Sequence, residues 1–212
     1  MPRAASILFS LFFFCASAPV LAQDNGSLNK VHLDLGVKLG ANLSMLDGQG
    51  WEGGYKTNIL GGAWVSIHGN RLGVQVDGLF SQTSYTTGPT FNSIYSQYLN
   101  AGKDSLKNGR FRLNYFNIPV LFQLRILSKA WLQVGPQYSG LVSVEDRDEF
   151  VKDAKGLFST GTLSGVAGLQ IQVTRHLNAG ARYIFGVSDF NKTDVSESWK
   201  QYDVQIHVGY KI

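Results

Sequence analysis

Apolar residues alternate with polar residues or glycine through most of the chain, and this pattern limits the possible folds more than any other feature. In residues 31–44 every odd-numbered position is apolar, while the even-numbered positions hold all the polar residues and both glycines. Residues 201–212 repeat the alternation to the last residue. Successive side chains of a β-strand point to opposite faces, so a period of two predicts strands with one apolar face.

Eight such segments occur, and the connections between them alternate strictly between long and short. The segments are 31–44, 56–68, 71–86, 110–126, 131–145, 158–174, 177–190 and 201–212. An even number of strands with short turns at one end and longer loops at the other is typical of outer-membrane barrels, whose short turns face the periplasm. The sequence therefore predicts an all-β fold, an eight-stranded antiparallel up-and-down transmembrane β-barrel. Its short turns and both termini would be periplasmic, and its longer loops extracellular.

The N-terminal residues have the features of a secretory signal peptide. Arg3 precedes an apolar run over residues 7–15, and the small residues Val20 and Ala22 suit the cleavage site. We expect cleavage after residue 22, which leaves residues 23–212 as the barrel domain and removes Cys15, the only cysteine. The rest of the chain has no apolar run of 18 residues, which excludes a membrane-spanning helix.

The low content of charged residues limits the classes of partner. Charged residues make up 16% of the chain. The chain has 19 basic and 15 acidic residues, and cleavage of the signal peptide removes one basic residue, Arg3. This small positive excess does not indicate nucleic-acid binding. Outer-membrane lipid and, during insertion, the barrel-assembly machinery are the expected partners, and an extracellular partner is left open.

Segment 110–126 changes phase in its middle. Phe111, Leu113 and Tyr115 are apolar at odd positions. The later apolar residues at even positions are Val120, Phe122, Leu124 and Ile126. Pro119 cannot donate a ladder hydrogen bond and is tolerated in strands chiefly at bulges and edges, so it predicts a β-bulge here. Two short strands joined by a kink are the alternative.

Charged residues on the polar face of the strands would point into the barrel. Four acids balance four bases, and an eight-stranded barrel is just wide enough for side chains to fill. We expect a salt-bridge network that closes the lumen, with a narrow ion path as the alternative. Trp64 shares this face and would help to plug the lumen. The eight charged residues are Asp34, Lys38, Asp77, Arg125, Glu145, Arg182, Asp203 and Lys211.

The second long connection contains five apolar residues at helical spacing. They are Phe91, Ile94, Tyr95, Tyr98 and Leu99, and Gly102 follows as a stop signal. This spacing predicts a short surface helix. Its apolar face would rest on the barrel rim or, alternatively, contact a partner or lipid headgroups.

Catalytic and metal-binding motifs are missing from the sequence. There is no H-E-x-x-H, no cysteine cluster and no phosphate loop. Barrel enzymes that modify lipid A hold histidine near the outer leaflet, whereas the predicted topology puts His32, His68, His176 and His207 on the periplasmic side. We therefore expect no enzymatic activity, no cofactor and no metal.

Three segments carry a resemblance to a known family. LDLGVKLGANLS at 33–44, RLNYFNIPVLFQLR at 112–125 and VQIHVGYKI at 204–212 resemble the porin-like outer-membrane β-barrel domain family, in particular its PorT-like group from Gram-negative bacteria. The resemblance covers the whole mature chain and implies insertion in the outer membrane. It implies no catalytic residues, and one branch of the family is linked to protein secretion. Ile212 replaces the terminal Phe that is usual in such barrels.

Three functional hypotheses follow. The first is a small outer-membrane barrel with a packed polar lumen and a structural or interaction role through its long extracellular loops. The second is a narrow porin or gated channel for small solutes. The third is a soluble lipocalin-like barrel, which would turn its apolar face inward around a lipid; Gly62 and Trp64 form a G-x-W motif of that family.

Overall fold

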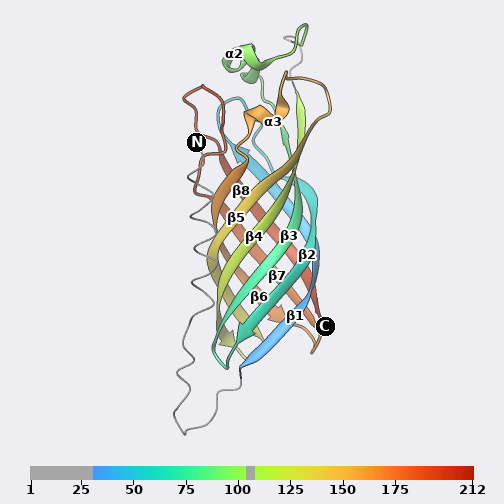
Figure 1. Ribbon diagram of the computed structural model, residues 1–212, viewed down its shortest axis with the longest axis vertical. Coiled ribbons are helices and arrows are strands. Elements are labelled where there is room, and N and C mark those ends of the chain that lie inside the picture. Colours follow the sequence, from blue (N-terminus) through green and yellow to red (C-terminus); the bar gives the residue numbers. More distant parts are fainter. Residues whose placement is uncertain (1–30, 104–107) are drawn as a thin grey trace, which may run out of the picture.

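In the computed structural model the chain forms a closed barrel of eight antiparallel strands, and β8 closes the ring on β1 (Figure 1). The structure describes residues 31–103 and 108–212, so the predicted signal peptide and Cys15 lie outside the described residues. The predicted eight-stranded up-and-down barrel is confirmed. Its strands are β1 His32–Asp47, β2 Lys56–His68, β3 Leu72–Thr86, β4 Arg110–Leu127, β5 Ala130–Asp146, β6 Gly161–Gln172, β7 Leu177–Gly186 and β8 Lys200–Lys211.

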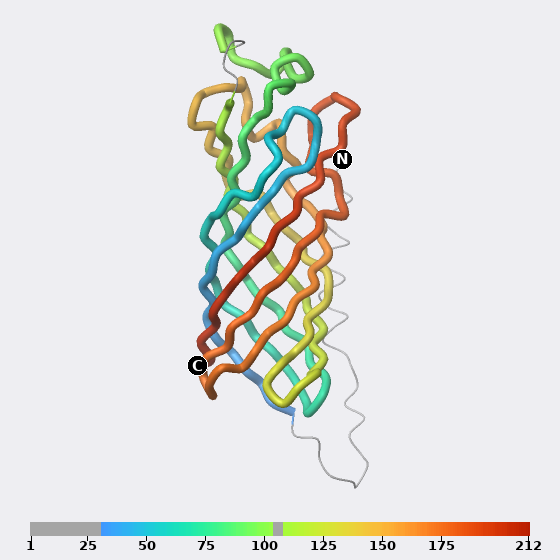
Figure 2. The backbone as a smooth tube through the Cα atoms, turned by 180° about the vertical axis from the view of Figure 1, so that it is seen from behind, coloured from blue at the N-terminus to red at the C-terminus, as the bar shows by residue number. Residues whose placement is uncertain are grey.

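The two ends of the barrel differ as the loop lengths predict. The turns at 69–71, 128–129 and 173–176 lie at one end, which we call the short-turn end, together with the C-terminus (Figure 2). The connections at 48–55, 147–160 and 187–199 lie at the other, the long-loop end, together with the described parts of the second connection, 87–103 and 108–109. The short helices α2 (Phe91–Ile94), η2 (Ser96–Tyr98) and α3 (Ala154–Leu157) belong to these long connections. Among the described residues no helix is long and apolar enough to cross a membrane.

The apolar face of the strands points outward. On β1, Leu33 and Leu39 are 69% and 71% exposed, whereas Lys38 and Asn42, on the other face, are buried. A lipocalin would have the opposite arrangement, because it binds its ligand on an apolar inner face. The lipocalin-like hypothesis is therefore wrong, and the G-x-W motif has no such meaning here.

The predicted bulge at Pro119 is wrong, and so is the alternative of two strands with a kink. β4 is one strand, and its register with β3 does not shift across Pro119, because Val76 pairs with Val120 and Leu79 with Asn117. Phe111 and Leu113 are buried inside the barrel, on the same face as Gln123. The apparent change of phase arises because the interior itself becomes apolar toward the long-loop end.

The β4–β5 pairing shifts register at two other places. Near the short-turn end Ile126 is an extra residue of β4, between Arg125, which pairs with Trp131, and Leu127, which pairs with Ala130. The second shift lies in β5. Asn114 pairs with Ser143 but Tyr115 pairs with Leu141, so Val142 is an extra residue in the β5 ladder. One extra residue exchanges the inward and outward faces of the strand beyond it. The face of β5 near the long-loop end therefore cannot be read from the alternation in its first half.

β6 and β7 are shorter than predicted. Phe158 and Phe190, which the alternation included in these strands, lie outside them and are fully buried. An isolated bridge joins Phe158 to Asn191. Both segments thus leave the barrel wall and turn their aromatic rings inward over the end of the barrel.

Candidate functional site

Inside the barrel, a buried group of three charged residues lies in the half nearer the short-turn end. The Asp77 carboxylate accepts hydrogen bonds from Lys38 Nζ at 2.7 Å and from Arg182 Nη1 at 2.5 Å. All three side chains are at most 1% exposed. We call Lys38, Asp77 and Arg182 the ion triad. Its two cations share one anion, and it joins β1, β3 and β7 across the lumen.

Glutamines bond to two members of the ion triad, whereas Arg182 Nη2 is buried without a hydrogen-bond partner among the described residues. Gln75 Nε2 donates to Asp77 Oδ1 at 2.6 Å, and Arg182 Nε donates to Gln133 Oε1 at 2.9 Å. Gln123 Nε2 donates in turn to Gln75 Oε1 at 2.8 Å. These buried amides fill the cross-section of the barrel with satisfied polar groups. These glutamines were not among the predicted lumen residues, which were all charged, although the same alternation places the glutamines on the inward face.

Glycines on the inward face make room for two bulky side chains. A Cβ at Gly36 would lie 2.8 Å from the ring of Trp64, and one at Gly180 would lie 2.6 Å from Nε2 of His207. Trp64 and His207 are both buried in the lumen. Trp64 thus lies where the sequence places it, whereas His207 lies within the barrel and not at its rim.

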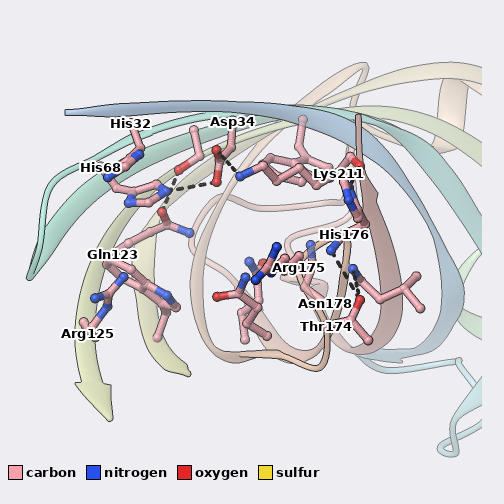
Figure 3. Close-up of a pocket in the computed structure, with 16 residues that line it drawn as sticks. His32, Asp34, His68, Gln123, Arg125, Thr174, Arg175, His176, Asn178 and Lys211 are labelled. Carbon is pink, nitrogen blue, oxygen red and sulfur yellow. Dashed lines mark hydrogen bonds and ion pairs between the residues drawn. The ribbon is translucent and has the colours of Figure 1, made fainter. Parts of the chain in front are cut away.

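Between the ion triad and the short-turn end the lumen opens into a cavity of about 230 Å³, which we call the vestibule (Figure 3). Asp34 lies in its wall and accepts hydrogen bonds from Lys211 Nζ at 2.6 Å and from His68 Nε2 at 3.0 Å. The other basic side chains that line the cavity are His32, Arg125, Arg175 and His176.

Aromatic rings hold one wall of the vestibule in place. The Arg125 guanidinium lies over the Trp131 ring, 4.5 Å from its centroid, and the His68 ring packs against Trp131 at 5.2 Å. The His32 and His68 rings are stacked at 5.5 Å. Because the two imidazoles face each other as stacked rings, they do not converge on a common ligand. Among the described residues no group of three or more His, Cys, Asp or Glu is placed to hold a metal ion.

The eight predicted lumen charges do not form one network. Three make the ion triad, Asp34 pairs with Lys211, and Arg125 lies apart on Trp131. Asp203 is buried with a hydrogen bond from Gln201 at 2.8 Å and no ion pair to a described residue.

Glu145 does not face the lumen. It is exposed at the long-loop end, 3.9 Å from Arg112, because the extra residue Val142 has exchanged the faces of β5. The prediction of an inward Glu145 is wrong for this reason.

At the long-loop end the interior is an apolar cluster to which every long connection contributes, and we call it the loop core. Trp51 is at its centre, with its ring in contact with five other aromatic rings at centroid distances of 5.0 to 6.2 Å. The buried members are Leu46, Trp51, Tyr85, Phe91, Tyr95, Leu99, Phe111, Leu113, Tyr115, Leu141, Phe150, Val151, Leu157, Phe158, Phe190 and Trp199.

The five residues of the predicted surface helix lie in this core. Phe91 begins α2, which is only four residues long, and Tyr98 ends η2, so one continuous helix is a wrong prediction. Phe91, Tyr95 and Leu99 are buried, and Ile94 and Tyr98 pack against the core. Tyr95 Oη accepts a hydrogen bond from Trp199 Nε1 at 2.9 Å. This apolar face is therefore covered by the protein's own loops.

Comparison with known proteins identifies the domain. A family model described as "outer membrane protein beta-barrel domain" matches residues 21–211. No curated protein is similar enough in sequence to count as a relative.

Several solved outer-membrane structures are similar in part. Ail of Yersinia pestis is 16% identical, with 85% of this chain and 99% of that chain covered and a TM-score of 0.43. Neisserial surface protein A is 13% identical over 84% and 97%, with a TM-score of 0.49. OprG of Pseudomonas aeruginosa is 12% identical over 84% and 95%, with a TM-score of 0.47.

Proposed function

The chain belongs to the outer membrane protein β-barrel domain family of Gram-negative bacteria, and from this premise we propose that it is a closed barrel with a structural or interaction role. Its outward apolar band contacts the lipid of the outer membrane. Its lumen does not conduct solutes across the membrane, and its packed long loops form one rigid surface outside the cell. The PorT-like group remains the predicted branch of the family.

The observation that supports this proposal is that the lumen is filled twice along its length. The ion triad and its glutamines occupy the barrel near the vestibule, and the loop core occupies the opposite end. A channel needs a continuous path of water, and a selectivity site must let ions leave as readily as they enter. Two cations locked on one buried carboxylate do not provide such a path.

Conductance of the purified protein in planar lipid bilayers tests the proposal. We expect no current steps above the baseline, under conditions in which a porin added to the same bilayers conducts. Current steps whose ion selectivity changes in an Asp77→Asn variant would overturn the closed barrel and establish the narrow-channel hypothesis.

The orientation of the barrel is part of the proposal, with the short turns in the periplasm. Labelling of single cysteines in whole cells with a membrane-impermeant maleimide tests it. Lys155→Cys in α3 should react, whereas Lys129→Cys in the β4–β5 turn should react only after the outer membrane is permeabilised. Both side chains are exposed in the structure, so a difference reports sidedness. The reverse pattern would contradict the orientation.

The long-loop surface is suited to binding because it is ordered. Asn100 Nδ2 of the second loop donates hydrogen bonds to the backbone carbonyls of Glu149 and Val151 in the third loop, at 2.7 and 3.1 Å. The Asp194 amide of the fourth loop donates to Tyr98 Oη at 3.0 Å. A preordered surface loses little conformational entropy when a partner binds.

Insertion by the barrel-assembly machinery is also part of the proposal. The outward apolar residues Ile206, Val208 and Tyr210 of β8 support it, because they continue the lipid-facing band of the barrel. We expect no catalytic activity, since the described site is built from paired charges and amides.

A further inference from the structure

The vestibule carries positive charge that no ion pair among the described residues neutralises. Its carboxylate, Asp34, is already occupied by Lys211 and His68. Arg125 and Arg175 line the same cavity, and neither forms an ion pair with any described residue. Deeper in the barrel, the ion triad adds one further unit of positive charge. The cavity therefore has a net positive potential.

Arg125 is held in place and has a free donor, whereas Arg175 is an exposed residue of the turn at 173–176. Arg125 is fixed over the Trp131 ring, and no described residue hydrogen-bonds its buried Nε. A buried donor without an acceptor is costly, and a ligand oxygen would remove that cost. Figure 3 shows that Arg125, Arg175 and Lys211 come from three separate elements, namely β4, the turn between β6 and β7, and β8.

We propose that the vestibule is a binding site for a phosphate group. Guanidinium groups bind phosphate oxygens with paired hydrogen bonds, and two guanidiniums match the charge of a phosphate dianion better than that of a single carboxylate. The neutral amides of Gln123 and Asn178 in the lining can donate to the remaining oxygens. A cavity of about 230 Å³ has room for phosphate and a small attached group.

Indole resonances of ¹⁵N-labelled full-length protein in phosphate-free detergent micelles provide the test, with inorganic phosphate as the probe. Trp64 and Trp131 line the vestibule, whereas Trp51 and Trp199 lie in the loop core at the other end. We expect phosphate to shift the Trp64 and Trp131 signals saturably. The Trp51 and Trp199 signals should stay in place, and chloride at the same ionic strength should have no effect.

Two variants and a matched control make the result specific to the site. Arg125→Gln and Arg175→Gln should each weaken phosphate binding about tenfold or more, the loss expected for one charge-assisted hydrogen bond. Lys129→Gln removes the same charge at the same end of the barrel, from a residue outside the cavity lining, and should bind as the native protein does. Heat-dependent gel mobility checks that each variant is folded.

Two further titrations show whether the phosphate group belongs to a soluble molecule or to a lipid headgroup. Saturable shifts with glycerol 3-phosphate in micelles indicate a soluble phosphomonoester, whereas shifts only in nanodiscs that contain phosphatidic acid indicate a lipid headgroup. The proposal would be overturned if no phosphate probe gave a saturable shift, or if Arg125→Gln and Lys129→Gln bound phosphate equally well. The NMR shifts test the phosphate site, and the bilayer conductance tests the closed barrel. Either proposal can therefore fail while the other holds.

Discussion

The two halves of the barrel interior are enclosed by the same strands but differ in their main filling, which is polar toward the short-turn end and aromatic toward the long-loop end. Toward the short-turn end the interior holds the ion triad, glutamines and the vestibule, whereas toward the long-loop end it holds the loop core. The outward face is apolar along both halves. Lipid constrains the outward positions to be apolar, but the inward positions need only fill space and satisfy their polar groups.

The difference predicts two kinds of dependence on single residues. A buried ion pair is stable only while both charges are present, so removal of one charged side chain leaves its partner buried and uncompensated. An aromatic cluster is held by contact area, so one removal leaves a cavity that neighbours can partly fill. The polar half also links strands of the wall directly, whereas the loop core is built largely from the connections.

Asp77→Asn should have the largest effect. It leaves the cations Lys38 and Arg182 buried within the barrel without their shared anion, and breaking a buried pair in this way costs about 3–5 kcal/mol. The barrel should unfold at a clearly lower guanidinium concentration. Unfolding in lipid vesicles, followed by tryptophan fluorescence and by gel mobility, measures the shift.

Glu145→Gln is the matched control for this variant. Glu145 was predicted to share the lumen but is exposed beside Arg112, so its removal should leave the unfolding midpoint within the range of surface substitutions, about 0.5 kcal/mol. Equal midpoints for Asp77→Asn and the native protein would contradict a structural role for the ion triad.

Phe158→Ala should have a smaller and more local effect. Phe158 is fully buried among Trp51, Phe111, Phe190 and Trp199. Loss of a buried Phe costs about 3–5 kcal/mol when the whole fold bears it, but loops can open without unfolding the wall. We expect faster trypsin cleavage in the long loops while the barrel keeps its folded gel mobility.

Tyr55→Ala is the control for the loop core. Tyr55 is an aromatic residue of the first long loop that is 46% exposed and is not a member of the core. Its removal should leave the rate of cleavage unchanged. A Phe158→Ala barrel that loses its folded mobility as readily as Asp77→Asn would mean that the loop core supports the wall as strongly as the ion triad does.

The same asymmetry explains what could be predicted from the sequence. Alternation gave the limits of β2 without error, and those of β3 and β4 within one residue, because the outward apolar face is imposed by the surrounding lipid. It also placed Lys38, Asp77 and Arg182 on the inward face. Which of the inward charges would meet could not be predicted, because that depends on the stagger of strands across the lumen.

Three of the wrong predictions concern the loop core or the strand next to it. Phe111 and Leu113 resemble a change of phase because the interior is apolar there, and Glu145 lies outward because of one extra residue in β5, which leaves no mark in the sequence. The spacing from Phe91 to Leu99 was helical, but contacts between loops broke the segment into α2 and η2. Tertiary packing overrode the local pattern in each case.

Gly36→Ala tests how the polar half accommodates its large aromatic residue Trp64. A Cβ at Gly36 would meet the Trp64 ring and the Tyr210 carbonyl oxygen, so we expect a loss of about 1–3 kcal/mol from overpacking. Gly78→Ala is the control, because its Cβ would lie in ordinary contact, 3.5 Å from Phe116. The two unfolding midpoints should differ by this amount, and equal midpoints would show that both the Trp64 ring and the Tyr210 backbone can move.

Acid should weaken one contact of the long-loop end, with the smallest effect of the series. The Asp148 carboxylate accepts hydrogen bonds from Arg110 Nε at 3.2 Å, Nη2 at 3.1 Å and the Arg110 amide at 3.0 Å. The Arg110 side chain holds the pKa of Asp148 below its usual value of 3.8. A lowered pKa stabilises the fold above pH 3.8, and this contribution is lost as the pH falls through the lower value.

The Arg110 amide resonance should therefore titrate with a midpoint below 3.8, and Asp148→Asn should remove that titration. Because Arg110 is exposed, the unfolding midpoint of the barrel should barely respond. An amide that titrates at or above 3.8 would mean that Asp148 is not held by Arg110. A contact at this rim that fails in acid while the barrel stays folded would show that the loops can loosen without the wall, as the comparison of the two halves requires.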